Sequence, residues 1–166
     1  MKVYPISGFP SGRLAIAARP RGGDWLEQDL SRMASSDWTV LVSALERSEE
    51  QELGLVQEHS IASLLGLDYF AFPVPDRGLP EMRRALELTA ELKTLLSIGS
   101  SIAVHCRMGI GRSSMLCGAI MVACGSKPEV AWKMLAAARQ ISVPDTDEQR
   151  QWLHRFQRSW ETRSGA

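Results

Sequence analysis

The sequence predicts a single α/β domain in which a central, mostly parallel sheet of about four or five strands is flanked by helices. Four short and almost continuously apolar runs alternate along the 166-residue chain with segments of helical character. Strands buried on both faces of a parallel sheet have this continuous apolar character. Hydrophobic residues make up 45% of the chain, which is enough for one core, and no repeat or linker interrupts it. The predicted domain therefore spans residues 1–166.

The apolar runs place the four predicted strands in chain order. The first strand is expected at residues 14–17 and the second at residues 38–42. The third is expected at residues 70–72 and the fourth at residues 102–104. Residues 1–10 are broken by prolines and a glycine, so no strand is assigned to them.

Helix boundaries are predicted from capping residues. Three pairs have the spacing of a capping box and are expected to begin helices: Asp24 with Glu27, Ser48 with Gln51, and Ser126 with Glu129. Apolar side chains recur at helical period between residues 82 and 96, and residues 113–124 are also compatible with a helix. Gly66 and Gly125 follow helical stretches and are expected to end them. These helices would then cover the sheet.

The most informative segment is residues 104–114, which reads Val-His-Cys-Arg-Met-Gly-Ile-Gly-Arg-Ser-Ser. A buried strand ends in Cys106, and a loop with two glycines then opens a helix. The backbone N–H groups of such a loop and the helix N-terminus favour anions, while both the helix and Arg112 favour the thiolate form of the cysteine. A buried cysteine without this context would be interpreted as structural. The residues together predict a phosphate cradle built around a nucleophile.

The order His105, Cys106, five residues, Arg112 and Ser113 resembles the signature of cysteine-dependent protein tyrosine and dual-specificity phosphatases. The resemblance implies a protein tyrosine phosphatase-like fold in which Cys106 attacks phosphorus and Ser113 eases departure of the thiolate. It also implies that His105 tunes the loop by hydrogen bonding. The residues implied to bind the phosphoryl group are Arg107, Met108, Gly109, Ile110, Gly111 and Arg112.

The reaction also needs a proton donor for the leaving oxygen, and Asp76 is the best candidate. It lies in a loop stiffened by three prolines and a glycine, directly after the third predicted strand. Dual-specificity phosphatases, which the chain resembles, keep their general acid at about this distance before the nucleophile. Asp68 is the rival carboxylate, although its place at the start of a strand favours a turn. The alternative for Asp76 itself is also a plain turn residue. The short length and this loop resemble the compact kinase-associated type.

The predicted function is a phosphatase that hydrolyses phosphotyrosine in proteins, with phosphoserine and phosphothreonine as a wider range, through a phosphocysteine intermediate. No metal or other cofactor is expected, because Arg112 and the loop amides supply the positive charge. One alternative is a phosphatase for a lipid or small-molecule phosphate, which basic residues within the signature would favour. The other is a noncatalytic module that binds phosphopeptides, against which the intact Cys106 and Asp76 argue.

Composition limits the partners and the compartment. The formal net charge is zero, so neither nucleic acid nor an anionic membrane is an expected partner. Three cysteines argue against a disulfide framework and favour a reducing, cytoplasmic location. Oligomeric state and phosphoresidue preference stay open at this point.

Several other residues have weaker functional interpretations. Residues 19–24 could contact a second phosphate, although a turn that leads into a helix is favoured, and Arg77 is similarly ambiguous. Gln149 could position the hydrolytic water, but its spacing from Thr146 favours a helix start. Cys117 and Cys124 are interpreted as packing residues that could form a disulfide under oxidation.

Overall fold

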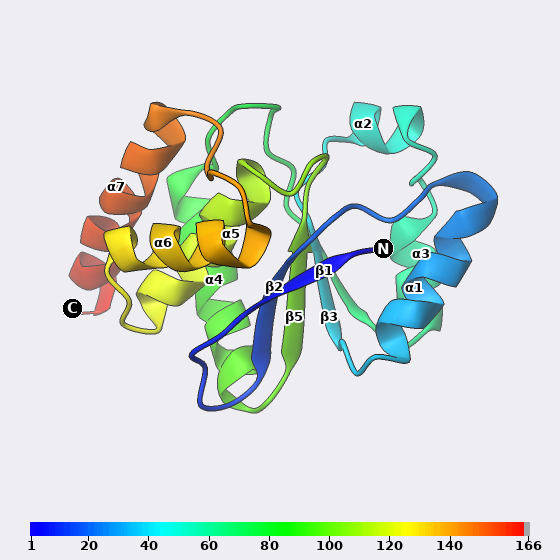
Figure 1. The fold of residues 1–166 in the computed structure, drawn as a ribbon, viewed down its shortest axis with the longest axis horizontal. Helices are drawn as coiled ribbons and strands as arrows, with labels where there is room; N and C mark the ends of the chain where they lie inside the picture. The colour runs from blue at the N-terminus through cyan, green and yellow to red at the C-terminus, as the bar shows by residue number, and fades with distance from the viewer. Residues whose placement is uncertain (165–166) are drawn as a thin grey trace.

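The computed structural model describes residues 1–164 and contains one five-stranded sheet with helices on both faces (Figure 1). The strands are β1 (Val3–Ile6), β2 (Arg13–Ala17), β3 (Val40–Ser43), β4 (Asp68–Ala71) and β5 (Ser101–His105). Their spatial order is β1-β2-β5-β3-β4. Only the β1–β2 pair is antiparallel, and the other three pairs are parallel. The predicted fold class is therefore confirmed.

The helices form two layers around this sheet. They are η1 (Gly23–Trp25), α1 (Leu26–Ala34), α2 (Arg47–Glu52), α3 (Glu58–Leu64), α4 (Met82–Ser97), α5 (Arg112–Ala123), α6 (Pro128–Arg139) and α7 (Asp147–Ser164). Figure 1 shows α4 to α7 on one side of the sheet and α1 and α3 on the other, with the short α2 above the ends of the strands. Within residues 1–164, no helix has both the length and the apolar character of a membrane span.

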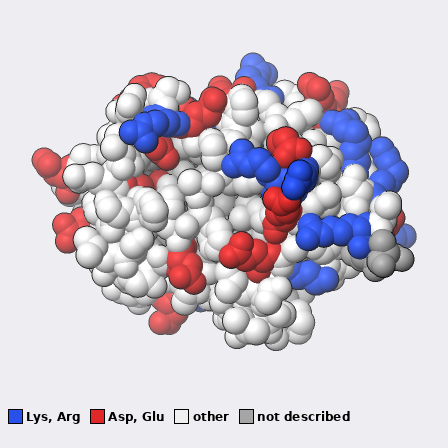
Figure 2. Space-filling view, turned by 180° about the vertical axis from the view of Figure 1, so that it is seen from behind, with Lys and Arg blue, Asp and Glu red and all other residues white. Residues whose placement is uncertain are grey.

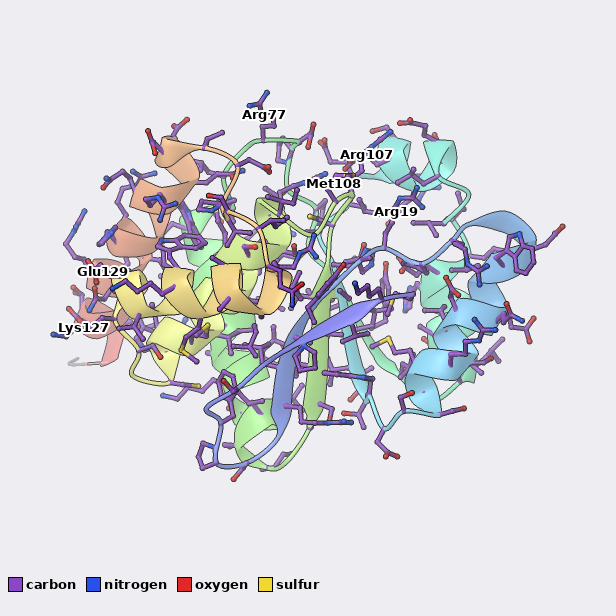
Figure 3. All side chains as sticks on the ribbon, viewed as in Figure 1. Arg19, Arg77, Arg107, Met108, Lys127 and Glu129 are labelled. Atoms are coloured by element: carbon purple, nitrogen blue, oxygen red, sulfur yellow. The ribbon has the colours of Figure 1, made fainter. Side chains whose placement is uncertain are left out.

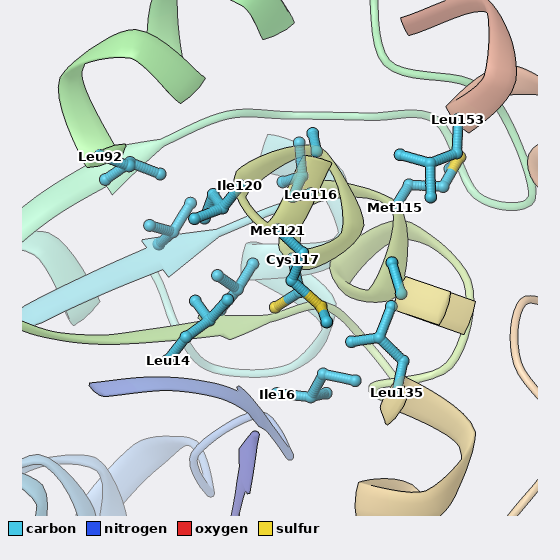
Figure 4. Packing of buried hydrophobic residues seen from close by; sticks show 14 of the residues in the cluster. Leu14, Ile16, Leu92, Met115, Leu116, Cys117, Ile120, Met121, Leu135 and Leu153 are labelled. Atoms are coloured by element: carbon cyan, nitrogen blue, oxygen red, sulfur yellow. The ribbon is translucent and has the colours of Figure 1, made fainter. Parts of the chain in front are cut away.

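Alternation along the strands divides the core into two parts. In β5, Ile102 and Val104 join the cluster beneath α4 to α7, whereas Ala103 joins the cluster beneath α1 and α3. All residues of α5 are buried, so this helix forms the centre of the larger cluster, where Leu116 and Met121 lie among strand and helix side chains (Figure 4). A helix that is apolar all round in this way belongs inside a core. Its N-terminus is consequently held in a fixed position at the end of β5.

The sequence analysis missed one strand. Residues 3–6 form the edge strand β1, because an edge position tolerates Pro5, which lacks a backbone N–H. The helical stretch that ends before Gly66 is two helices, α2 and α3. Gly66 and Gly125 do follow helices, with positive φ values of 77° and 99°.

The three predicted helix caps were also wrong. Asp24 lies inside η1, and α1 begins after it without a side-chain cap. Ser48 lies inside α2, which begins one residue earlier because Glu46 and Glu49 form the capping box. The start of α6 is set by Pro128 in its first turn, where the missing N–H costs nothing, and Lys127 occupies the cap position.

The parallel strands bring three distant loops together at one edge of the sheet. The loops that follow β3, β4 and β5 all leave from the carboxyl ends of adjacent strands. Ligands bind at this edge in open α/β sheets. Asp68 is the first residue of β4 and pairs with Val40, so it lies at the opposite edge. Topology alone therefore separates Asp68 from the loop that carries Cys106.

Candidate active site

The signature loop, residues 106–112, joins β5 to α5 and wraps around the sulfur of Cys106. The cysteine is buried, and its Sγ accepts a hydrogen bond from the Gly109 N–H at 3.2 Å. The hydroxyl of Ser113, on the first turn of α5, lies 3.3 Å from the same sulfur. The first N–H groups of a helix have no partner within the helix. The sulfur is thus placed where backbone donors and a hydroxyl converge.

Two glycines in the loop are required for different reasons. Gly109 has φ +68°, a left-handed conformation that side chains disfavour, and a Cβ there would lie 3.0 Å from the Ala17 carbonyl oxygen. Gly111 has an ordinary φ, but a Cβ there would overlap Asp145 Oδ2 and lie 2.7 Å from Gln149 Oε1. Close approach, and not backbone conformation, therefore selects glycine at position 111.

Arg112 is buried and held by a carboxylate that the sequence analysis missed. Its Nη1 and Nη2 donate to the two oxygens of Glu49 at 2.5 and 2.9 Å, in the bidentate geometry that suits a guanidinium. Burial acts most strongly and lowers the pKa of Arg112, but the hydrogen bonds to Glu49 and the electrostatic attraction of Cys106, Glu49 and Asp76 together hold that pKa above its ordinary value. For Glu49, burial acts to raise the pKa, but the hydrogen bonds from Arg112 and from the Glu46 N–H, with the charges of Arg112 and Arg107, together hold it below its usual range. The pair keeps Arg112 charged and oriented beside Cys106.

The structure brings Asp76 to the same place. Its Oδ1 lies 3.2 Å from Nη2 of Arg112, and its side chain is two-thirds exposed at 66%. Asp76 and Cys106 line one pocket of about 190 Å³, together with Arg77, Arg107, Met108, Gly111, Arg112 and Asp145. The loop that holds Asp76 is fixed at Val74, whose carbonyl accepts a 3.0 Å hydrogen bond from Arg112. The carboxylate predicted to be the acid therefore shares a pocket with the predicted nucleophile.

Of the remaining residues of the signature loop, some line the pocket and one packs against the hydrophobic core. Arg107 lines the pocket while its guanidinium pairs with Glu52 at 2.6 and 2.9 Å. Met108 is exposed at the pocket mouth, and Ile110 packs toward the core and can offer only its backbone to a ligand. Figure 3 shows Arg19, Arg77, Arg107 and Met108 at the same end of the molecule.

The acidic and basic side chains are otherwise interspersed. Figure 2 shows both signs on the face opposite to that of Figure 1, with basic groups more frequent toward α4 and α7. Arg21, by contrast with Arg19, points to a structural partner, because it pairs with the buried Asp29 at 2.6 Å. The turn interpretation of residues 19–24 thus holds for Arg21, and Arg19 lies at the same end of the molecule as Arg107 (Figure 3).

Two polar side chains lie beside Gly111: Asp145 from the segment before α7, and Gln149 from the first turn of α7. The Gln149 backbone N–H donates to Thr146 Oγ1 at 3.1 Å, as expected for a helix start. The Gln149 side chain is also fully buried and bridges two backbones, accepting from the Asp145 N–H at 3.1 Å and donating to the Gly78 carbonyl at 3.2 Å. Burial raises the pKa of the Asp145 carboxyl, Arg77 opposes this effect, and Asp76 adds to it. Gln149 therefore joins the loop that carries Asp76 to α7.

His105 does not hydrogen bond to the signature loop as the resemblance implied. It points to the α1 and α3 side of the sheet, where its Nε2 lies 3.0 Å from Oε1 of the buried Glu58, without the alignment of a hydrogen bond. The alternation of β5 causes this, because adjacent residues of a strand face opposite sides. Cys117 is buried in α5, and burial raises its pKa, which disfavours the thiolate needed for disulfide exchange.

Residues 15–126, about two-thirds of the chain, match the family described as "Polymorphic toxin system, DSP-PTPase phosphatase". The chain belongs to this DSP-PTPase phosphatase family. The match begins in β2 and includes the Asp76 loop and the whole signature loop.

Curated relatives of this DSP-PTPase chain include cyclin-dependent kinase inhibitor 3 from two mammals. The protein of Rattus norvegicus is 27% identical over 108 residues, which cover 64% of this chain and 45% of that protein. The protein of Homo sapiens is 29% identical over 86 residues, which cover 51% of this chain and 41% of that protein. The chain thus matches less than half the length of these relatives.

Solved structures similar to this DSP-PTPase chain confirm its fold. The kinase associated phosphatase (KAP), crystallised with its catalytic cysteine replaced by serine, superposes with a TM-score of 0.88 at 19% identity, covering 96% of both chains. PTPMT1 in complex with PI(5)P superposes with a TM-score of 0.75 at 18% identity, covering 91% of this chain and 94% of that one. Together with the family match and the curated relatives, this fold confirms the resemblance to the compact kinase-associated type.

Proposed function

We propose that this chain is a cysteine-dependent protein phosphatase and that residues 1–166 form its catalytic domain. The observation that carries the proposal is the common pocket lined by Cys106, Arg112 and Asp76, in which the Cys106 Sγ accepts a hydrogen bond from the Gly109 N–H. A nucleophile, a fixed positive charge and a proton donor in one pocket are the parts that phosphoryl transfer without a metal requires.

In the first step, the Cys106 thiolate attacks phosphorus and the bond between phosphorus and the leaving oxygen breaks. Asp76 gives its proton to that oxygen, so that the leaving group departs as an alcohol or phenol. The Arg112 guanidinium and the loop N–H groups hold the three phosphoryl oxygens, on which the charge is spread. Arg107, Met108, Gly109, Ile110 and Gly111 supply the backbone of this cradle.

In the second step, water attacks the phosphorus of the phosphocysteine and the bond between sulfur and phosphorus breaks. Asp76, now ionised, takes the proton from the water, and inorganic phosphate leaves. The Ser113 hydroxyl, 3.3 Å from the sulfur, donates to the departing thiolate. The two steps together consume the phosphorylated substrate and one water, and they return Cys106 and Asp76 to their starting forms.

A phosphorylated protein or peptide is the proposed substrate. Two similar proteins support a protein substrate, because the names cyclin-dependent kinase inhibitor 3 and kinase associated phosphatase both refer to a kinase. A phosphoinositide is the second candidate, because a neighbouring fold was crystallised with PI(5)P and the exposed Arg77 lines the pocket. No partner nucleic acid or membrane is proposed, and a cytoplasmic location stays a prediction.

Phosphate release without metal from matched phosphotyrosine and phosphothreonine peptides tests this function. The wild type should release phosphate, and Cys106→Ser should reduce release to background. Cys124→Ser is the matched control, since Cys124 is exposed and caps the C-terminal end of α5, and it should retain wild-type release. The ratio of the two peptide rates then gives the phosphoresidue preference.

The other outcomes each contradict the proposal. Release from a phosphoinositide with none from either peptide would establish the lipid alternative. Tight peptide binding without release by the wild type would establish a noncatalytic binding module. Full release by Cys106→Ser would exclude the phosphocysteine mechanism.

A further inference from the structure

Arg139, the last residue of α6, contacts the signature loop from the side opposite to the pocket. Its Nε donates to the Gly109 carbonyl at 2.7 Å and its Nη2 donates to the Met108 carbonyl at 3.2 Å. The guanidinium carbon also lies 4.0 Å from the ring centroid of Tyr4, on β1. One planar guanidinium therefore bonds two consecutive carbonyls while it stacks on an aromatic ring.

These two carbonyls belong to peptide units whose N–H groups point the opposite way. In a trans peptide the C=O and the following N–H are antiparallel. The Met108 carbonyl shares its peptide plane with the Gly109 N–H, which donates to Cys106 Sγ at 3.2 Å. The Gly109 carbonyl shares its plane with the Ile110 N–H. By holding both carbonyls outward, Arg139 turns both N–H groups inward.

The loop needs such an anchor because it is glycine-rich at this point. Gly109 has φ +68° and little steric resistance to rotation of its neighbouring peptide planes. Rotation of either plane would present a carbonyl oxygen, instead of an N–H, to the thiolate and to the phosphoryl oxygens. Hydrogen bonds from a charged donor are about twice as strong as neutral ones, and a rigid fork can fix two acceptors at once.

We propose that Arg139, within the phosphatase function proposed above, is a positioning residue that fixes the Met108–Gly109 and Gly109–Ile110 peptide planes with their N–H groups toward Cys106. Tyr4 holds the guanidinium in place and so connects the edge strand β1 to the signature loop. Arg139 itself does not touch the substrate.

The test is Arg139→Ala, with two readouts: the alkylation rate of Cys106 by iodoacetamide at neutral pH, and the kcat for an aryl phosphate. We expect kcat to fall by roughly 10²-fold, as with loss of one oxyanion-hole donor. The alkylation rate should fall by about tenfold, because fewer N–H groups stabilise the thiolate. Arg139→Lys should recover part of both losses, since a lysine can bond one carbonyl but cannot fix two planes.

Arg13 provides a matched control at the opposite edge of the sheet. It also stacks on an aromatic ring, with its guanidinium carbon 4.7 Å from the Trp38 centroid, and it also donates to two consecutive carbonyls, those of Ser36 and Asp37. Arg13→Ala should lower the melting temperature and leave kcat and the alkylation rate at wild-type values. Tyr4→Leu, which keeps Arg139, should give a smaller change in the same direction as Arg139→Ala and covers the case in which that variant does not fold.

Wild-type kcat and alkylation in Arg139→Ala or, if it does not fold, in Tyr4→Leu would overturn the proposal. Equal losses in Arg13→Ala would also overturn it, because the effect would then be one of general stability. If instead the chain is not a phosphatase, the wild type will show no turnover that depends on Cys106. The alkylation rates of the wild type and of Arg139→Ala would still test the role of Arg139 in that case.

Discussion

At the scale of single residues, the pocket combines groups that come from three loops and one helix start. Cys106 supplies the sulfur, and Asp76 supplies an exposed carboxylate 3.2 Å from Arg112. Asp76 is ionised between the two steps, so it regains from the attacking water the proton that it gave to the leaving oxygen. Asp68, the other carboxylate near this strand, is at the far edge of the sheet. The roles of the two aspartates can therefore be separated by one pair of variants.

Asp76→Asn should slow hydrolysis of substrates with poor leaving groups by roughly 10² to 10⁴-fold, because an amide cannot protonate the departing oxygen. An activated aryl phosphate needs little protonation, so its rate should fall much less. Asp68→Asn is the matched control and should leave both rates unchanged. Comparison of kcat on an alkyl phosphate and on an activated aryl phosphate checks this, and a wild-type alkyl rate in Asp76→Asn would exclude Asp76 as the acid.

At the scale of elements, the short helix α2 holds two arginines of the signature loop. Glu49 and Glu52 lie three residues apart, on the same side of the helix, and bond Arg112 and Arg107 respectively. The first pair is buried, whereas the second is exposed. Glu49 also closes the capping box of its own helix, since its Oε2 accepts from the Glu46 N–H at 3.0 Å. One side chain thus fixes both the start of α2 and the orientation of Arg112.

Glu49→Gln should reduce the free energy of unfolding at neutral pH by about 3 kcal/mol, because it removes the buried counter-charge of Arg112 and leaves the exposed Asp76 carboxylate as its nearest one. The folded-state pKa of Glu49 is lowered, so its contribution exists above the usual glutamate pKa of about 4.3 and is lost as the pH falls through the folded value. The difference between wild type and variant should therefore shrink in acid. Urea unfolding at neutral and acid pH measures this.

Glu52→Gln is the control for this prediction, since it removes an exposed pair from the same helix. It should change the stability much less at either pH, because exposed ion pairs are screened by solvent. A difference for Glu49→Gln that is independent of pH would contradict the electrostatic explanation.

At the scale of the whole molecule, one sheet separates two apolar clusters that share no residues. Leu30 of α1 is buried in the smaller cluster and Ile120 of α5 in the larger one. Both clusters contact the same strands through opposite faces, so the domain should unfold as one unit even though its core has two parts. The carboxyl ends of the strands between the clusters are where the candidate site lies.

Leu30→Ala should cost about 2–5 kcal/mol of unfolding free energy and Ile120→Val about 0.5–1.5 kcal/mol. Because the two side chains have no common neighbours in the clusters, the double variant should lose the sum to within about 0.5 kcal/mol. Denaturant unfolding followed by both tryptophan fluorescence and circular dichroism checks the sum. Two separate transitions would show that the two halves are not one cooperative domain.

The sequence by itself determined the α/β class, the signature loop and the loop that carries Asp76. Each of these depends on neighbours in the chain: apolar runs make strands, and a cysteine, glycines and an arginine at fixed spacing make an anion-binding turn. The sequence misplaced the three helix caps for different reasons, because α1 begins without a side-chain cap, Glu46 caps α2 in place of Ser48, and Pro128 sets the start of α6. The edge strand β1 was missed because Pro5 is tolerated only where no neighbouring strand needs its N–H.

Only the tertiary structure decided which partners complete the site. Glu49 is 63 residues from Arg112, Arg139 is 30 residues from Gly109, and Gln149 is 71 residues from Gly78. No local spacing encodes such pairs, because they arise when parallel strands deliver distant loops to one edge of the sheet. The burial that shifts the pKa values of Glu49 and Arg112 also arises only when the chain folds. The type of chemistry was therefore predicted from one segment of the sequence, whereas the orientation of the groups that perform it depends on contacts made by the folded chain.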